Sequence, residues 1–227
     1  MEDNITTHLY TYCRSSAAYR VRIALNLKGI TYQPEFIHLM NNGGENFQEH
    51  YTQLNPQALI PLLVEQPQDS PSFIVSQSLA IIEYLEEKYP TPALLPKDPM
   101  DRAYVRSLAL LICCDIHPLN NLRVLKYLHD EFNATKQTTQ TWYHHWIYEG
   151  FQALESHLKN KPMSKIFCYF DQPSLADVCL IPQVYNAKRF HCDLSPFPQI
   201  THIYENCMQL AAFKDAAPEN QQDHEIQ

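Results

Sequence analysis

A proline-rich stretch divides the chain into two parts with different sequence patterns. Residues 90–99 read Pro-Thr-Pro-Ala-Leu-Leu-Pro-Lys-Asp-Pro. Proline has a fixed φ and no backbone N–H, so neither a regular helix nor a central strand is expected to run through this stretch. We therefore expect a stiff linker at 90–99, one domain at 1–89 and a second domain at 100–217. The polar residues 218–227 are expected to form a mobile tail.

The first part alternates between strand-like and helix-like segments. Strands are expected at 8–12, 32–39, 62–65 and 73–75, and helices over 17–28 and 79–89. The order is β-α-β followed by β-β-α. A crossover helix joins parallel strands, whereas a hairpin joins antiparallel strands. The first part is therefore predicted to be an α/β domain with a mixed sheet.

The second part has helical spacing of its apolar residues almost throughout. Helices are expected over 100–116, along the apolar stripe 142–158, from the cap residue Ser174 with Asp177 at its third position, and over 198–210. The polar stretch 130–141 is expected to be a loop. Pro118 should end the first of these helices, and Pro182 should perturb the third. These patterns predict an all-helical domain.

Charge and cysteine usage exclude several classes of function. The chain has 17 Lys and Arg against 25 Asp and Glu, a net charge of −8, which argues against a nucleic-acid partner. Its longest apolar run, 108–114, is too short to span a bilayer, so no membrane partner is expected. The seven cysteines form no CxxC pair and the histidines no HExxH motif. We expect a reduced, cytoplasmic protein without a metal site.

The segment Arg14-Ser15-Ser16 stands where a strand ends and a helix begins. A helix N-terminus carries free N–H groups and a partial positive charge, so it attracts anions. A serine hydroxyl at this place is suited to stabilising a thiolate. Ordinary N-capping by Ser15 explains the same residues without any ligand.

Two further segments of the first part are candidates for ligand binding. Pro61 follows Ile60 immediately before a strand, either as a plain first residue of the strand or as a cis-proline that turns the Ile60 backbone towards a ligand. Gln77 and Ser78 precede a helix, which suits a carboxylate. A second capped helix is the alternative for this pair.

Taken together, the motifs resemble the zeta-class glutathione transferases, the maleylacetoacetate/maleylpyruvate isomerase family. The resemblance extends from about His8 to Phe213. It rests on the serine segment with its Arg-Val-Arg-Ile-Ala-Leu ending, Asn-Pro-x-x-x-Ile-Pro at 55–61, Gln-Ser-Leu-Ala-Ile-Ile-Glu-Tyr-Leu at 77–85, Pro-Thr-Pro-x-Leu-Leu-Pro at 90–96, Asp-Ile-His-Pro-Leu-Asn-Asn at 115–121 and Leu-Ala-Asp at 175–177.

The resemblance implies a thioredoxin-like domain with a mixed four-stranded sheet, followed by an α-helical bundle domain, in a homodimer. It implies glutathione as cofactor and a cis–trans isomerisation of maleylacetoacetate in tyrosine and phenylalanine degradation. Catalysis is assigned to Ser15, Ser16 and Arg14; glutathione binding to Ser15, Ser16, Ile60, Gln77 and Ser78; and binding of the dicarboxylate substrate to Arg14, His117, Asn121, Arg123 and Arg189. Arginine suits a carboxylate because it donates two parallel hydrogen bonds.

One residue departs from the family pattern. Many members have cysteine after the two serines, whereas this chain has Ala17. Cys13 lies on the strand side of the segment and is interpreted as a packing residue. The attacking thiol is therefore expected to be that of glutathione.

Three alternatives to maleylacetoacetate isomerisation stay open. Maleylpyruvate is a second keto-acid substrate within the same family. A general glutathione transferase would conjugate or dehalogenate small electrophiles, and would not favour dicarboxylates over neutral aryl halides. A non-catalytic protein that only uses this fold is the third, although Ser15, Gln77 and Ser78 argue against it.

Overall fold

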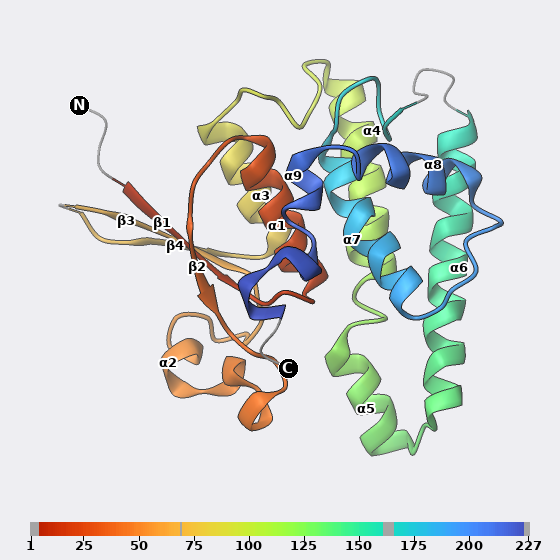
Figure 1. Cartoon of the computed structure of the whole chain (residues 1–227), viewed down its shortest axis with the longest axis horizontal. Coiled ribbons are helices and arrows are strands. Elements are labelled where there is room, and N and C mark those ends of the chain that lie inside the picture. The colour runs from red at the N-terminus through yellow and green to blue at the C-terminus, as the bar shows by residue number, and fades with distance from the viewer. Residues whose placement is uncertain (1–4, 69, 161–165, 225–227) are drawn as a thin grey trace. The chain divides into compact units, whose positions relative to one another are not determined.

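The computed structural model describes residues 5–68, 70–160 and 166–224, and the chain forms two compact units. The first unit comprises Met1–Ala93 together with Leu210–Gln227, and the second comprises Leu94–Gln209. Figure 1 shows strands only in the first unit, while the second consists of helices and their connections. None of the described helices is long and apolar enough to cross a membrane.

A four-stranded mixed sheet forms the centre of the first unit. Its strands are β1 (Ile5–Thr11), β2 (Gln33–Phe36), β3 (Leu62–Pro67) and β4 (Phe73–Ser76), in the spatial order β2-β1-β3-β4. β1 runs parallel to β2, and the other two pairs are antiparallel. The predicted mixed sheet and its strands are therefore confirmed. Leu9 of β1 lies opposite Leu63 of β3, and both are fully buried.

Helices α1 (Ser16–Leu27) and α3 (Ser78–Lys88) pack against each other in this unit (Figure 1). Gly29 follows the C-cap of α1 and has a φ of 66°. This left-handed backbone conformation is common just after a helix and favours glycine. The connection from β2 to β3 is long and partly helical. It contains two 3₁₀ turns, at Asn41–Gly43 and Glu45–Phe47, and the short helix α2 (Glu49–Thr52).

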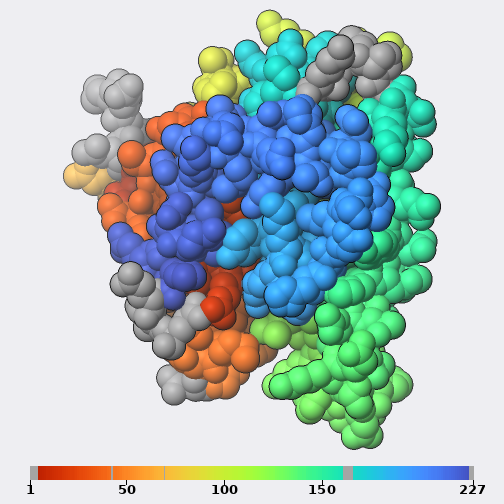
Figure 2. All heavy atoms as spheres, turned by 45° about the vertical axis from the view of Figure 1, so that its right-hand side comes forward, coloured from red at the N-terminus to blue at the C-terminus, as the bar shows by residue number. Residues whose placement is uncertain are grey.

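The C-terminal segment packs on the first unit, which corrects the expected boundary at 217 and, for residues 218–224, the expected mobile tail; residues 225–227 of that tail lie outside the described residues. It forms α9 (Ala211–Lys214) and 3₁₀ turns at Pro218–Asn220 and Gln222–His224. In Figure 2 it lies, in dark blue, over the red and orange residues of the same unit. Tyr19 donates a hydrogen bond to the Phe213 carbonyl at 3.2 Å, and Asp223 is only 3% exposed. Asp223 accepts a hydrogen bond from the Cys13 N–H, a contact that polarity along the sequence does not reveal.

The second unit consists of α4 (Pro99–Leu110), a π-helical turn (Leu111–Ile116), α5 (Leu122–Phe132), α6 (Lys136–Asn160), α7 (Leu175–Arg189) and α8 (Pro198–Cys207). The helix expected over 100–116 therefore ends in a π-helical turn. Gly150 of α6 lies against Ile116 at this turn. A Cβ on Gly150 would lie 2.2 Å from the Ile116 side chain, so only glycine permits this approach.

One expectation for this unit was wrong. The stretch 130–141 is not a loop, because α5 continues to Phe132 and α6 begins at Lys136. The polar stretch comprises the exposed end of α5 and the first turns of α6, which are also mostly exposed, so its composition reflects solvated helix ends. Helix α7 continues through Pro182, because burial along most of its length outweighs the one hydrogen bond that proline removes.

Candidate functional site

Ser15 begins α1, and its side chain has two functions available to it. Its Oγ accepts a hydrogen bond from the Ala18 N–H at 3.2 Å, so the residue is the N-cap of the helix. A hydroxyl can accept and donate at the same time. Within the part of the chain that the structure describes, no group accepts the Ser15 O–H. Capping and donation to a bound anion are therefore compatible at this residue.

The loop that leads into Ser15 is held by buried side chains. Arg22 of α1 is fully buried and donates to Thr11 Oγ1 at 3.0 Å and to the Cys13 carbonyl at 2.9 Å. Its Nε also donates to the Ala216 carbonyl at 2.9 Å. The Cys13 N–H donates to Asp223 Oδ2 at 2.8 Å. These contacts make Arg22 a structural residue, and nothing in the sequence signalled the contact of Asp223.

Arg14 and Ser16 flank Ser15 on either side. Arg14 is half-buried in the turn before the helix, and Ser16 is the first helical residue, with 5% of its surface exposed. Ser16 lies in the first turn of α1, where the backbone N–H groups and the positive end of the helix dipole are found. These three neighbouring residues therefore form the part of the first unit that is best suited to an anion.

The Ile60-Pro61 peptide bond is cis, which is the second of the two alternatives that the sequence left open for Pro61. The residues before it are held by side chains: Tyr51 and Asn55 both donate to the Leu59 carbonyl at 2.6 Å. Ile60 belongs to a core cluster that also contains Tyr12 and Cys13. The structure thus brings the Ile60 segment against the loop that carries Ser15.

Gln77 and Ser78 start α3. Gln77 has a φ of 71°, is exposed, and donates through Nε2 to Gln57 Oε1 at 2.8 Å. Ser78 is buried, and its Oγ accepts a hydrogen bond from Arg20 Nη1 of α1 at 3.3 Å. This contact links the two helix starts that the sequence selected for anions.

Three predicted residues of the helical unit lie around the start of α5. His117 is half-buried and follows the π-helical turn, where its N–H donates to the Ile112 carbonyl at 2.9 Å. Asn121 is the N-cap of α5, because its Oδ1 accepts from the Arg123 N–H at 3.1 Å. Arg123 itself is exposed. The cap gives Asn121 a structural function that the sequence had not assigned to it.

Arg189 is the last residue of α7, and its side chain is exposed. Its Nη1 lies 3.4 Å from Asn186 Oδ1, and its guanidinium lies 5.2 Å from the centre of the Phe190 ring. Phe190 stacks on the buried Tyr143 ring, and the two ring centres are 4.0 Å apart. Burial raises the pKa of Tyr143, so that phenol stays neutral. No carboxylate pairs with Arg189 among the described residues, so its charge is available to a ligand.

The cysteine nearest the serine segment is not placed as a nucleophile. Cys13 is fully buried, and burial together with the nearby Asp223 raises the pKa of its thiol. A thiolate is the reactive form of cysteine, so a raised pKa lowers reactivity at neutral pH. Ala17, which follows the two serines at the start of the helix, has no thiol either.

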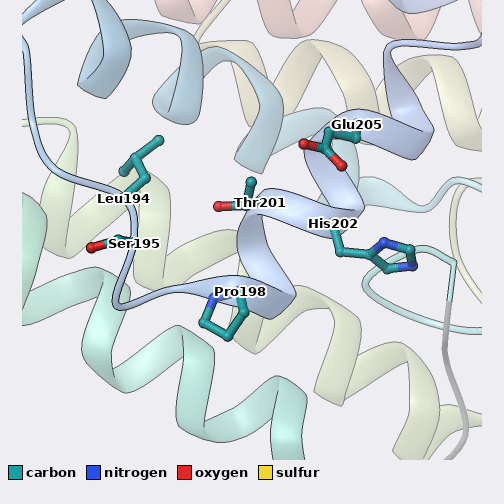
Figure 3. Close-up of a pocket in the computed structure, with 6 residues that line it drawn as sticks. All are labelled: Leu194, Ser195, Pro198, Thr201, His202 and Glu205. Carbon is teal, nitrogen blue, oxygen red and sulfur yellow. The ribbon is translucent and has the colours of Figure 1, made fainter.

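Two cavities in the described part of the helical unit are lined by residues other than the predicted site residues. One, of about 350 Å³, is lined by Leu194 and Ser195 together with four residues of α8, Pro198, Thr201, His202 and Glu205 (Figure 3). Another, of about 440 Å³, lies against α6 beside Tyr148 and Lys159. In the described residues, no group of three or more His, Cys, Asp or Glu side chains is arranged to hold a metal ion.

The mixed sheet, the serine-capped α1 and a separate helical unit define a protein of the glutathione transferase class. Residues 9–93 match the family model described as glutathione S-transferase, N-terminal domain. The chain is 47% identical to a probable maleylacetoacetate isomerase of Vibrio cholerae, over 95% of this chain and 97% of the relative. It is 45% identical to a maleylpyruvate isomerase of Ralstonia sp., over 95% of this chain and 98% of the relative.

Solved structures of isomerases have the same fold as this chain. A holo structure of maleylpyruvate isomerase, a bacterial glutathione S-transferase of the zeta class, has a TM-score of 0.89 and 44% identity over 95% of this chain and 99% of its own. A maleylacetoacetate isomerase of Methylobacterium extorquens with bound malonate and glutathione has a TM-score of 0.87 and 36% identity over 94% and 97% of the two chains. The chain belongs to the zeta-class glutathione transferase family, which contains the maleylacetoacetate and maleylpyruvate isomerases.

Proposed function

We propose that this chain is a glutathione-dependent maleylacetoacetate isomerase. The observation that carries the proposal is its similarity to maleylacetoacetate isomerases across nearly its whole length, which covers both the serine segment and the arginines of the helical unit. A protein that only used the fold would not need a hydroxyl available at the start of α1.

The reaction is a reversible addition to a cis carbon–carbon double bond. The glutathione thiolate attacks one carbon of the bond, and the electron pair moves onto the conjugated carbonyl as an enolate. The former double bond is now single and rotates. The enolate then reforms the double bond in the trans geometry and expels the thiolate, so glutathione is regenerated and no net oxidation occurs.

Ser15 stabilises the thiolate of glutathione in this proposal. A free thiol has a pKa near 8.5, so most of it is protonated at neutral pH and the site must favour the anion. The Ser15 O–H donates to the sulfur while its oxygen caps α1. Ser16 lies in the first turn of α1, where the positive end of the helix dipole favours the anion, and Arg14 adds a neighbouring positive charge.

The rest of glutathione is held by the first unit. The Ile60 backbone beside the cis bond pairs with the peptide backbone of glutathione, and Gln77 with Ser78 binds a carboxylate at the start of α3. This assignment is supported by the contacts within that unit: Ile60 clusters with Tyr12 and Cys13, next to the serines, and Ser78 is bonded to Arg20 of the serine-capped helix.

The dicarboxylate substrate is bound by cations of this otherwise acidic protein. Arg189 and Arg123 are exposed and have no carboxylate partner among the described residues, and we assign them with Arg14 to the substrate carboxylates. His117 and Asn121 complete the set at the start of α5. A related isomerase whose structure holds malonate with glutathione supports a dicarboxylate as the ligand class.

Maleylpyruvate is a second candidate substrate, favoured by a specific observation. A maleylpyruvate isomerase is 45% identical over nearly the full length, close to the value for the maleylacetoacetate isomerases. Both substrates are cis-configured keto-dicarboxylates, so the same residues serve either one.

The experiment is a comparison of kcat/KM for three substrates at fixed glutathione. Maleylacetoacetate is expected to give the highest value and maleylpyruvate the second, with a neutral aryl halide far below both. A higher value for maleylpyruvate would reverse the order of the two isomerase assignments. A higher value for the aryl halide would favour a general transferase, and no turnover of any substrate would favour a non-catalytic protein.

We also propose that the chain is a homodimer and that it works in the cytoplasm. The family resemblance supports the first. The cysteine pattern, with no CxxC pair, supports a reducing compartment.

A further inference from the structure

Arg20 is a buried cation whose hydrogen-bonding capacity is largely unused. It lies on α1 and is only 2% exposed. Its Nη1 donates to Ser78 Oγ at 3.3 Å, whereas Nε and Nη2 have no hydrogen-bond partner among the described residues. A guanidinium stays protonated at physiological pH, so the positive charge is buried without a carboxylate within reach in the described part of the chain.

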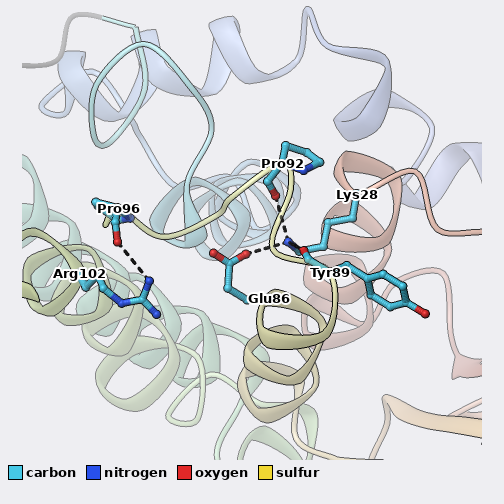
Figure 4. A network of polar contacts seen from close by, with 6 residues as sticks. All are labelled: Lys28, Glu86, Tyr89, Pro92, Pro96 and Arg102. Carbon is cyan, nitrogen blue, oxygen red and sulfur yellow. Dashed lines mark hydrogen bonds and ion pairs between the residues drawn. The ribbon is translucent and has the colours of Figure 1, made fainter. Parts of the chain in front are cut away.

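The other buried cations of the same unit are satisfied. Arg22, two residues further along α1, donates to Thr11 Oγ1 and to the carbonyls of Tyr12, Cys13 and Ala216. Lys28, at the end of α1, lies 2.7 Å from Glu86 Oε2 and donates to the carbonyls of Tyr89 and Pro92 at 2.6 and 3.0 Å (Figure 4). Burying an ion is costly unless it is paired and hydrogen-bonded. Arg20 is therefore the exception, and its location needs an explanation.

The one contact that Arg20 makes points to the start of α3. Ser78 Oγ accepts from Arg20, so the Ser78 hydroxyl hydrogen is directed to another acceptor. Ser78 is the first residue of an 11-residue helix, where backbone N–H groups and the helix dipole favour an anion. The unpaired Arg20 guanidinium and the N-terminus of α3 are independent features. Each of them favours the binding of a negative charge beside Ser78.

We propose that Arg20 is a positioning residue of the glutathione site. Its guanidinium fixes the Ser78 oxygen as an acceptor, so that the Ser78 O–H donates to a carboxylate of glutathione, and it adds buried positive charge behind that carboxylate. Arg20 acts through Ser78 and does not touch the ligand. This inference rests on the proposed function, since it takes glutathione as the ligand of the first unit.

Calorimetry on the full chain tests the coupling between Arg20 and a ligand carboxylate. Wild type, Arg20→Met and Arg20→Lys are titrated with glutathione and with its two monoamides, in each of which one carboxylate is converted to a neutral amide. Wild type is expected to bind one monoamide about 10-fold more weakly than glutathione, the lower end for a lost charge-assisted hydrogen bond. In Arg20→Met that difference disappears, because glutathione itself binds about 10-fold more weakly. Arg20→Lys keeps the charge and restores most of the difference.

Lys28→Met is the matched control, because it also removes a buried cation from the end of the same helix. It is expected to lower thermal stability while leaving the difference between glutathione and the monoamide unchanged. Should Arg20→Met fail to fold, Arg20→Gln, which removes the charge but keeps a polar side chain, is titrated with the same three ligands and is expected to reduce the difference as well.

Two results would overturn the inference while leaving glutathione binding intact. One is an Arg20→Met variant that still binds the monoamide 10-fold more weakly than glutathione. The other is a wild type that binds glutathione and both monoamides equally. A wild type that binds no glutathione at all would refute the proposed function, and this inference with it.

Discussion

Ser15 combines two properties at the residue scale: its oxygen caps α1, and its hydroxyl hydrogen is available to a thiolate. Ser15→Ala is expected to lower kcat/KM for isomerisation about 100-fold, by analogy with the loss of one oxyanion donor. Loss of the cap should also reduce the free energy of unfolding by about 1 kcal/mol. Steady-state kinetics and urea unfolding measure the two effects separately.

Ser15→Asn separates the two properties, since asparagine is a good N-cap but has no hydroxyl. Stability should recover in this variant, while the rate stays low. A Ser15→Ala enzyme with the wild-type rate and pH profile would show that the hydroxyl has no part in catalysis.

Arg189 is assigned to a substrate carboxylate. A charge-assisted hydrogen bond contributes about 1.5–3 kcal/mol, so Arg189→Ala should raise KM for maleylacetoacetate roughly 10- to 150-fold. The glutathione affinity should change little. Lys188→Ala is the matched control, because Lys188 is the neighbouring exposed cation and lies 4.0 Å from the centre of the Tyr204 ring. If glutathione binding collapsed and KM for the dicarboxylate did not move, Arg189 would belong to the other ligand.

At the scale of elements, the start of α7 depends on one buried carboxylate. Asp177 accepts hydrogen bonds from the Cys168 N–H at 2.7 Å and from the Ser174 N–H at 2.8 Å, and also from the Ser174 hydroxyl. Asp177→Ala leaves two buried N–H groups without acceptors and should lower the free energy of unfolding by about 2–4 kcal/mol. Ser174→Ala leaves the carboxylate in place and should cost only about 1 kcal/mol. Equal losses for both variants in urea unfolding would contradict this division.

The C-terminal segment is the second element that supports the proposed site. Asp223 holds the Cys13 N–H next to the serine segment, from a position 210 residues away in sequence. Asp223→Ala should destabilise the protein by about 1–3 kcal/mol, the cost of a buried unsatisfied donor, and should lower the isomerisation rate. Glu219→Ala removes an exposed carboxylate from the same segment and should change neither. A fully active, equally stable Asp223→Ala protein would show that the segment does not support the loop.

Local chemistry explains which features could be predicted from the sequence. The sheet, α1, α3 and the Ser174 cap follow from periodicity and from residues within one turn of each other. The failures involve information that is not local. The stretch 130–141 was taken for a loop because almost all of its residues are polar, so the exposed end of α5 and the first turns of α6 show no apolar periodicity there. Asp223 resembles any polar residue of a tail until the fold brings it to Cys13, and the unused donors of Arg20 exist only in the packed unit.

At the scale of the whole molecule, a homodimer is expected from the family resemblance. The long helices of the second unit bury most of their own apolar faces, for example Val105, Leu108, Ile147 and Phe151, and so leave little of them for a partner. Large apolar side chains that stay exposed are the candidates for a partner surface: Met40, Phe47, Phe73 and Ile74 in the first unit, and Met100, Leu122, Tyr127 and Phe132 in the second.

Sedimentation at micromolar concentration is expected to give a species of twice the 26.5 kDa chain mass. A single 26.5 kDa species across the concentration range would refute the dimer. Phe47→Ser and Phe132→Ser form a matched pair, since the two rings are 65% and 68% exposed and belong to different units. Each substitution removes a similar exposed apolar area, so the two variants differ only in the unit from which the ring is removed. The variant that dissociates at the higher concentration identifies the unit that supplies the interface, because burial of an exposed aromatic ring contributes to association only where the partner covers it.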